Sequence, residues 1–286
     1  MGQKLLRLLK LSLALGFLVL SEPARSADYP AGLVTEAEAL LENLNDGTEI
    51  VLIDTRPQRA YEKGHIPGAV WIDVGEWKAA FESGEDGSTW GARLGALGVT
   101  PEARVVVYDD GFSPRAARSW WLLRYWGITQ ATILNGGWQA WTEASGMISQ
   151  DPPTPTAAST AQSLSPVESR LLVGDQLRSL LADNGAPQLV DVRSEREFFQ
   201  GSVPGAINLD WNDLVDKETG KLLTPDALRQ KFVDAGIDPN RPIATYCRTG
   251  GRASVSAFAL EAIGSPGPKN YCGGWTEWSA AQDSAP

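Results

Sequence analysis

Short apolar runs bounded by turn residues alternate along this chain with apolar positions at helical spacing. The runs EIVLID (49–54), VVVY (105–108) and IATY (243–246) predict buried strands. Beyond the last run, one face of a helix is expected to consist of Val255, Phe258, Ala259, Ala262 and Ile263. Strands that alternate with helices in this way favour a parallel-type α/β sheet.

Glycines and one polar signal indicate where some helices begin and end. Gly264 is expected to end the helix after IATY, and Gly127 to end the helix that contains WWLLRYW (120–126). The segment Thr35-Glu36-Ala37-Glu38 has the order of a capping box, in which a threonine and a glutamate three residues later cap the first turn. An apolar helix is therefore predicted to follow a cap at Thr35.

The chain repeats itself at a constant offset. Residues 51–69 read VLIDTRPQRAYEKGHIPGA, and residues 188–206 read QLVDVRSEREFFQGSVPGA. The segment GGWQAW (136–141) matches GGWTEW (273–278) at the same offset. Such self-similarity indicates two domains of one fold that arose by duplication.

The repeat and the composition together set the predicted domain boundaries. The first domain is assigned to residues 28–145 and the second to residues 167–286. Residues 146–166 are rich in Pro, Ser, Thr and Ala and have little to bury, so they are expected to form an extended linker.

The first 27 residues have the pattern of a secretory signal peptide. Lys4, Arg7 and Lys10 precede an uncharged apolar run at residues 11–20, and small residues follow at 24–27. The apolar run is too short for a permanent membrane span, although an uncleaved membrane helix is the alternative. Removal of this leader would place the mature protein in the periplasm or outside the cell, with no stable membrane association.

The chain is acidic, with a formal net charge of −10 at pH 7. Loss of residues 1–26 would bring the mature chain near −13, because this segment contains four cations and one anion. A negative surface repels nucleic acid and anionic membranes, so both are excluded as partners. An anionic substrate would therefore need a local basic site.

Cysteine and histidine are scarce in this sequence. Two cysteines, Cys247 and Cys272, cannot form a disulfide framework, and a single histidine, His65, cannot supply a histidine-rich metal site. We therefore expect no metal. Ser202 stands in place of His65 in the repeat that contains Cys247, so His65 is expected to be a structural turn residue, with a catalytic base as the alternative.

A reactive cysteine is predicted where the strand IATY ends. Cys247 follows the strand directly, and the loop RTGGR (248–252) leads into the next helix. A helix N-terminus offers unpaired N–H groups and a positive dipole end, which favour a thiolate and bound anions. The glycines let backbone amides converge, and the arginines add local positive charge. The loop therefore predicts a cradle for a thiolate or its anionic adduct, with an inert buried cysteine as the alternative.

The motif Cys247-x-x-Gly250-x-Arg252 resembles the active-site loop of the rhodanese family, and Asp-x-Arg, Gly-x-Ile/Val-Pro-Gly-Ala and Gly-Gly-Trp-x-x-Trp resemble its other motifs. This resemblance covers nearly the whole mature chain. It implies an α/β fold with two tandem rhodanese-like domains, each a mainly parallel five-stranded sheet flanked by helices. It also implies that only the second domain is catalytic. Asp109 stands where that domain has Cys247, and a carboxylate cannot act as a sulfur nucleophile.

The resemblance further implies a sulfurtransferase that works by double displacement. Cys247 would take sulfur from a small anionic donor, hold it as a persulfide and pass it to a thiol or cyanide, with no metal or organic cofactor. Thiosulfate is the expected donor, because thiosulfate users of the family have basic residues after the cysteine; 3-mercaptopyruvate is the alternative. The residues expected to bind the donor are Arg193, Arg248, Thr249, Gly250, Gly251 and Arg252.

Other interpretations of these residues stay open. Arg252 lies five residues after Cys247, one fewer than in the related dual-specificity phosphatases, which disfavours phosphatase or arsenate chemistry. A sulfur-relay protein or an anion-binding module with little turnover is an alternative to the enzyme. For Arg193 the alternative is a structural ion pair with Asp191. Where family members often have a second arginine, this chain has Glu197.

Cys272 departs from the family, in which this position is usually Asp. Its segment is expected to end the strand beside the one that leads to Cys247, which places both cysteines at the same edge of the sheet. A disulfide would require Cα atoms within about 7 Å. Cys272 is expected to be either a small, partly buried thiol or a residue that resolves an oxidised Cys247. Phe112 is expected to line the cleft between the domains.

Overall fold

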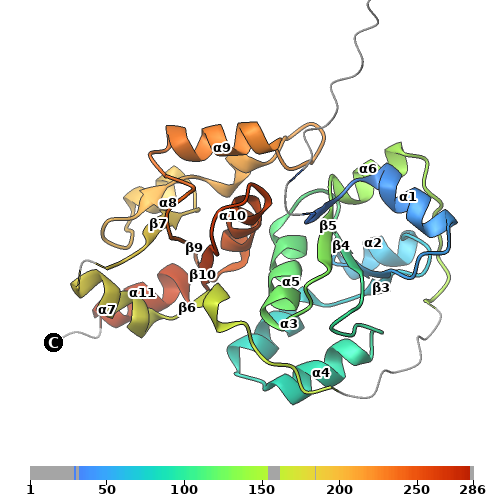
Figure 1. Ribbon diagram of the computed structural model, residues 1–286, viewed down its shortest axis with the longest axis horizontal. Helices are drawn as coiled ribbons and strands as arrows, with labels where there is room; N and C mark the ends of the chain where they lie inside the picture. The colour runs from blue at the N-terminus through green and yellow to red at the C-terminus, as the bar shows by residue number, and fades with distance from the viewer. Residues whose placement is uncertain (1–28, 30–31, 154–161, 184, 284–286) are drawn as a thin grey trace, which may run out of the picture.

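The computed structural model describes residues 29, 32–153, 162–183 and 185–283. The predicted signal peptide, residues 1–27, lies outside the described residues. The described residues form two parallel five-stranded sheets with flanking helices, one sheet in each half of the sequence (Figure 1). Within the described part, no helix has the length and apolar character needed to cross a bilayer.

The first sheet and its helices lie between residues 34 and 143. In chain order the elements are β1 (Val34–Thr35), α1 (Ala37–Asn45), β2 (Val51–Asp54), α2 (Gln58–Lys63), β3 (Val70–Trp71), α3 (Val74–Glu82), α4 (Gly87–Gly95), β4 (Val105–Tyr108), α5 (Pro114–Tyr125), β5 (Ala131–Leu134) and α6 (Gly137–Glu143).

The second sheet and its helices lie between residues 168 and 283. In chain order the elements are η1 (Glu168–Arg170), β6 (Leu171–Leu172), α7 (Gly174–Ala182), β7 (Gln188–Asp191), α8 (Glu195–Phe199), β8 (Ile207–Asn208), η2 (Trp211–Leu214), α9 (Pro225–Asp234), β9 (Ile243–Tyr246), α10 (Gly251–Ala262), β10 (Lys269–Tyr271) and α11 (Gly274–Asp283).

The two sheets have the same strand order. It is β1-β5-β4-β2-β3 in the first and β6-β10-β9-β7-β8 in the second, and every strand pair is parallel. The central strands β4 and β9 are buried at all four positions, which explains their uninterrupted apolar sequences. The predicted fold class is thus confirmed, and the runs VVVY and IATY correspond to these two strands.

The predicted helix ends are confirmed, whereas the predicted capping box is wrong. Gly127 and Gly264 follow α5 and α10 with φ of +86° and +80°, a left-handed conformation that glycine adopts without strain. Helix α1 begins after Glu36, which makes no side-chain cap. Thr35 instead belongs to β1, and its hydroxyl hydrogen-bonds the hydroxyl of Thr132 on β5 at 2.7 Å. The Thr35 side chain, which the local sequence pattern predicts to cap the helix, therefore forms a hydrogen bond within the sheet instead.

The described part of the predicted linker packs closely against the first domain. Residues 162–166 run beside α4, where the Leu164 N–H donates to the Gly87 carbonyl at 2.9 Å. A Cβ at Gly91 would overlap the carbonyl oxygen of Gln162, so the glycines of α4 permit this approach. At the other end, Ser149 pairs with His65 as an antiparallel bridge.

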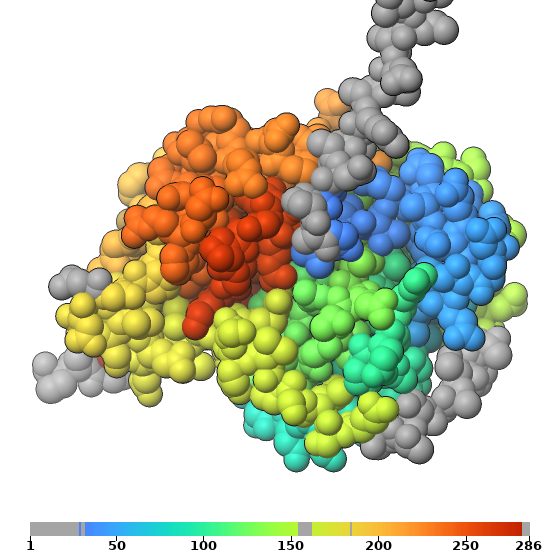
Figure 2. Space-filling view, in the orientation of Figure 1, coloured from blue at the N-terminus to red at the C-terminus, as the bar shows by residue number. Residues whose placement is uncertain are grey.

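One hydrophobic core crosses the boundary between the domains. Helix α5 of the first domain packs against α10 of the second, and both lie at the centre of the molecule (Figure 1). The ring of Phe258 on α10 contacts Phe112 at 5.1 Å and Trp120 at 4.6 Å between centroids. Figure 2 shows the two halves in contact with one another as one body. The helix that follows Cys247 is thereby fixed against the first domain.

Candidate active site

Strand β9 carries Cys247 to the start of helix α10. The residue is 2 % exposed and its thiol is free. The strand is fixed to the helix by the Thr245 hydroxyl, which donates to the carbonyl of Ala253 at 3.0 Å. Gly250 caps α10 with φ of +82°, a left-handed conformation that lets the loop turn directly into the helix. Cys247 therefore occupies the end of a parallel strand beside a helix N-terminus, where α/β folds bind ligands.

The carbonyls of this loop are held by the neighbouring helix α11. The Trp275 N–H donates to the Cys247 carbonyl at 2.8 Å, and the Thr276 N–H donates to the Arg248 carbonyl at 3.2 Å. In trans peptides the next N–H points opposite to each carbonyl, so the N–H groups of Arg248 and Thr249 point away from α11. Neither of these N–H groups, nor that of Gly250, donates to another described residue. Three loop amides are thus available to an anion.

Arg252 lies close to Cys247 but already has an anionic partner. Its guanidinium forms two hydrogen bonds to the carboxylate of Glu197, at 2.6 and 2.8 Å. This pair lowers the pKa of Glu197 to about 2, with the Arg252 hydrogen bond as the main cause. The same pair raises the pKa of Arg252, and the nearby Cys247 adds to that shift. The charge of Arg252 is therefore shared between Glu197 and the cysteine loop.

Arg248 and Arg193 differ sharply in their surroundings. The Arg248 side chain is exposed and makes no ion pair or hydrogen bond with the described residues. The Arg193 side chain is 4 % exposed, pairs with Asp191 at 2.6 Å and donates to the Gly201 carbonyl, also at 2.6 Å. These contacts agree with the alternative prediction that Arg193 forms a structural ion pair with Asp191. They do not support a role in donor binding, which stays a prediction.

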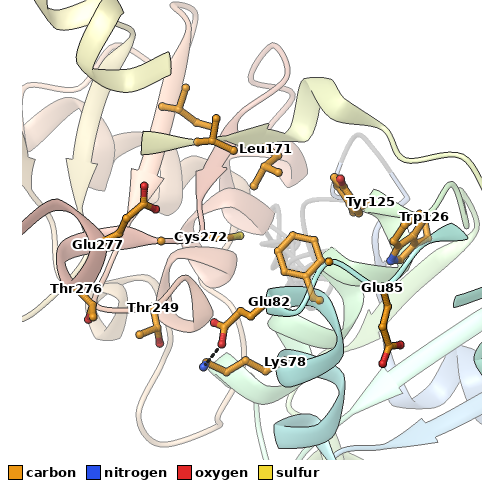
Figure 3. Close-up of a pocket in the computed structure, with 15 residues that line it drawn as sticks. Lys78, Glu82, Glu85, Tyr125, Trp126, Leu171, Thr249, Cys272, Thr276 and Glu277 are labelled. Atoms are coloured by element: carbon orange, nitrogen blue, oxygen red, sulfur yellow. Dashed lines mark hydrogen bonds and ion pairs between the residues drawn. The ribbon is translucent and has the colours of Figure 1, made fainter. Parts of the chain in front are cut away.

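A cleft of about 700 Å³ opens between the two domains beside the loop. Figure 3 shows Thr249 and Cys272 of the second domain on one side, with Glu82 and Tyr125 of the first domain opposite. Cys247 itself is not among the residues that line this cleft. The cleft therefore gives access to the loop next to Cys247 and to the second cysteine.

Two expectations about individual side chains can be assessed at this point. Phe112 does not line the cleft as predicted, because its ring packs against α10 in the core between the domains. His65 is 1 % exposed, stacks on Tyr61 at 4.0 Å and bonds through its ring nitrogens to the carbonyls of Tyr61 and Asp151. These contacts agree with a structural role in the first domain.

Both halves of the chain match one family. The family model of the rhodanese-like domain matches residues 36–144 and 174–281. This chain belongs to the rhodanese family. Its two matches in tandem, on two sheets of identical strand order, agree with the organisation expected from the sequence.

Two of its relatives are sulfurtransferases of similar length. The chain is 29 % identical over 279 residues to the 3-mercaptopyruvate sulfurtransferase of Escherichia coli (strain K12), with 86 % of this chain and 95 % of the relative covered. It is 31 % identical over 272 residues to the thiosulfate sulfurtransferase of Pseudomonas aeruginosa, with 90 % and 97 % covered. The crystal structure of SseA from Escherichia coli superposes with a TM-score of 0.73 at 28 % identity and covers 85 % of this chain and 98 % of its own. The protein is a tandem-domain rhodanese sulfurtransferase.

The first rhodanese domain has the same loop scaffold without the cysteine. Asp109 follows β4 as Cys247 follows β9, and its carbonyl accepts the Trp138 N–H at 2.8 Å. The carboxylate of Asp109 accepts hydrogen bonds from the Asp110 N–H and from the hydroxyl of Ser113, the N-cap of α5. Burial raises the pKa of Asp109. This side chain therefore occupies the place at the helix start that an anion would take.

One residue beside the Cys247 loop has no clear signal in the sequence. Arg118 of α5 is 2 % exposed, and its Nη1 lies 3.4 Å from Sγ of Cys272. It also lies over the loop, because a Cβ at Gly250 would overlap Nη1 of Arg118. The only sequence signal was an arginine within the apolar helix PRAARSWWLLRY, a position that the pattern alone does not connect to Cys272.

Proposed function

We propose that this rhodanese sulfurtransferase takes sulfane sulfur from thiosulfate and carries it as a persulfide on Cys247. The observation that carries the proposal is the set of three unpaired loop amides, at Arg248, Thr249 and Gly250, beside a thiol at a helix N-terminus. Preorganised N–H groups of this kind stabilise negative charge on a terminal sulfur.

The proposed reaction has two displacements. The Cys247 thiolate attacks the outer sulfur of thiosulfate, the S–S bond of the donor breaks, and sulfite leaves with the electron pair. The sulfur that remains on Cys247 is then attacked by a thiol or cyanide, and Cys247 leaves as a thiolate. Neither displacement needs a metal or an organic cofactor.

Charge at the loop supports thiosulfate over 3-mercaptopyruvate. Thiosulfate is a dianion and its leaving group, sulfite, is also strongly anionic, whereas 3-mercaptopyruvate has a single carboxylate. The unpaired, exposed Arg248 offers positive charge at the loop of an otherwise acidic protein. We test the donor by measuring kcat/KM for both compounds with cyanide as acceptor. A higher value for thiosulfate is expected, and a tenfold preference for 3-mercaptopyruvate would overturn the choice of donor.

The persulfide is tested with the variant Cys247→Ser. A serine hydroxyl is not ionised at neutral pH, so sulfur transfer should fall by about a thousandfold or more. The intact mass of the wild-type protein should rise by one sulfur atom after thiosulfate, and the variant should show no increase. A matching circular dichroism spectrum and midpoint of thermal unfolding serve as controls for the fold. Residual turnover comparable to wild type would remove Cys247 from the mechanism.

We also propose that the protein acts in the periplasm or outside the cell. This rests on the basic, apolar and small-residue segments within residues 1–27. N-terminal sequencing of the protein from fractionated cells tests it. The mature chain is expected to begin at residue 27 or 28 in the exported fraction, and an intact leader in the cytoplasmic fraction would argue against export.

A further inference from the structure

The two cysteines follow paired residues on neighbouring strands. Tyr246 of β9 and Tyr271 of β10 are register partners, and Cys247 and Cys272 come directly after them. The tyrosines pack in the core on one side of the sheet, whereas both cysteines belong to the core on the α10 side. Because side chains alternate along a strand, both thiols therefore face the same side of the sheet at its carboxyl edge.

Arg118 gives Cys272 a buried positive charge. The Nη1 atom lies 3.4 Å from Sγ of Cys272, and the Nε and Nη2 atoms are buried with no hydrogen-bond partner among the described residues. No carboxylate of the described part forms an ion pair with this arginine. Its guanidinium also lies over the aromatic rings of Phe81 and Trp121.

An unpaired buried guanidinium is costly, because arginine stays charged and loses its hydration on burial. The Cys272 thiol does not compensate this charge in the resting protein. Burial raises the pKa of Cys272 to about 11, although Arg118 acts in the opposite direction, so the thiol is neutral near pH 7. A persulfide is a stronger acid than a thiol and would present an anion to Arg118. The site thus has a charge that a sulfur-loaded Cys272 would balance.

Both cysteines are buried, at 2 % exposed for Cys247 and 7 % for Cys272, but they differ in what they border. Cys272 lines the interdomain cleft together with Thr249, whereas Cys247 is absent from its walls. In Figure 3 the Cys272 side chain extends into the cleft toward the first domain. An acceptor thiol too large to reach the buried Cys247 would meet Cys272 first.

We propose that Cys272 is a second sulfur-carrying residue, loaded from the Cys247 persulfide and stabilised by Arg118, which delivers sulfur to a thiol acceptor in the interdomain cleft. This inference rests on the proposed function of Cys247. In the transfer step the Cys272 thiol loses its proton to water in the cleft, and its sulfur bonds to the outer sulfur of the Cys247 persulfide. The bond between that sulfur and Cys247 breaks, and Cys247 leaves as a thiolate. No net oxidation occurs, so no oxidant is required.

The experiment loads the full chain with thiosulfate, traps persulfides with an iodoacetamide reagent and maps the labelled peptides by mass spectrometry. In the wild type we expect the trapped extra sulfur on both Cys247 and Cys272. In Cys272→Ser it should appear on Cys247 alone, and in Cys247→Ser on neither residue. Absence of sulfur from both cysteines of the wild type would defeat the proposed function itself. Sulfur confined to Cys247 in the wild type would defeat only the relay.

Variants of Arg118 provide the matched control for the charge. Arg118→Met removes the charge but retains an apolar side chain of similar length, and it should reduce the fraction of trapped sulfur on Cys272 by about tenfold. Arg118→Lys should restore part of that fraction. In both variants the sulfur on Cys247 reports whether the first displacement still operates. An unchanged distribution between the two cysteines in Arg118→Met would overturn the role of the arginine.

A kinetic measurement separates delivery from a resting store of sulfur. Cys272→Asp removes the sulfur carrier but gives Arg118 a carboxylate partner, so it keeps the local charge balanced. Single-turnover transfer from the loaded protein to a bulky thiol such as glutathione should slow by about tenfold in this variant relative to wild type. Equal rates in the two proteins would mean that Cys272 takes no part in delivery.

Discussion

The loops after β4 and β9 are the same scaffold used in two ways. In both domains an aspartate pairs with the arginine two residues later, Asp54 with Arg56 and Asp191 with Arg193. In both, a tryptophan N–H from the last helix of the domain, α6 or α11, donates to the first loop carbonyl at 2.8 Å. The two loops differ in what lies at the helix start. In the first domain it is the carboxylate of Asp109, whereas in the second domain the loop N–H groups have no acceptor among the described residues.

The comparison shows that the two loops differ in more than the cysteine. In the first domain the Asp109 carboxylate accepts a hydrogen bond from the Asp110 N–H. The Phe112 N–H donates to the carbonyl of Gly220. Helix α5 then begins with Pro114, which has no N–H to offer. The cysteine is therefore only one difference among several, because N–H donors around position 109 already have acceptors in the first domain. Four predictions test this comparison, from the largest expected effect to the smallest.

The largest effect concerns the ion pair that both domains share. Asp54 and Asp191 are fully buried, so Arg56→Met or Arg193→Met would leave a buried carboxylate without its partner. Each variant should lose about 3–5 kcal/mol in the free energy of unfolding, measured with urea. Similar losses in the two domains would show that Arg193 is structural, as Arg56 is. If Arg193→Met is as stable as wild type but binds thiosulfate more weakly, the prediction that Arg193 binds the donor is supported instead.

The next effect distinguishes the charges around the open loop. Arg248 has no anionic partner among the residues that the structure describes, whereas Arg252 is neutralised in part by Glu197. Arg248→Glu should therefore raise the KM for thiosulfate by about tenfold or more, because it reverses an exposed charge that faces an anionic donor. Steady-state kinetics with an uncharged sulfur donor provide the control. An equal rise for both donors would mean that Arg248 shapes the loop and does not attract charge.

A smaller effect follows from the pair that only the second domain has. The pKa of Glu197 is lowered to about 2 by Arg252, so the pair stabilises the folded protein above the usual glutamate range. This stabilisation should disappear as the pH falls from about 4.5 to about 2, because protonation of Glu197 then removes it. Both side chains are partly exposed, so we expect only about 1 kcal/mol.

The matching measurement compares wild type with Glu197→Gln. The difference between their free energies of unfolding should be about 1 kcal/mol at pH 6 and close to zero at pH 2. The first domain has Arg115 at the position equivalent to Arg252, but Ala60 stands where the second domain has Glu197, so it offers no such pair. A difference that stays constant over this pH range would show that the ion pair does not stabilise the fold.

The sequence predicted the parts of this molecule that depend on local pattern. Strands β4 and β9 were predicted to the residue, because both their faces are buried and their sequences are therefore apolar throughout. The end of α10 was predicted because its last turn leads into a positive φ, which favours a glycine, here Gly264. The two-residue edge strand β1 is too short to produce a pattern, and for that reason Thr35 was assigned to a helix cap.

The missed features of the site depend on contacts between distant segments. Arg118 and Cys272 are 154 residues apart and meet only because α5 packs on α10. The sequence shows Glu197 where the family often has arginine, but the pairing of Glu197 with Arg252 depends on how α8 lies against the loop. Helix-to-helix placement of this kind leaves no periodic trace in either segment.

The smallest expected effect is none, for Asp109→Cys in the Cys247→Ser background. A thiol at position 109 would follow β4 at the same place as Cys247 follows β9, so the scaffold alone would predict a second active site. Its surroundings oppose this. The Phe112 N–H remains bound to Gly220, and Asp110 places a carboxylate where the second domain has Arg248. We expect no turnover of thiosulfate with cyanide and no mass increase of one sulfur atom. A persulfide at position 109 would show that a cysteine on this scaffold is sufficient, and that the open amides and basic charge of the second loop are not required.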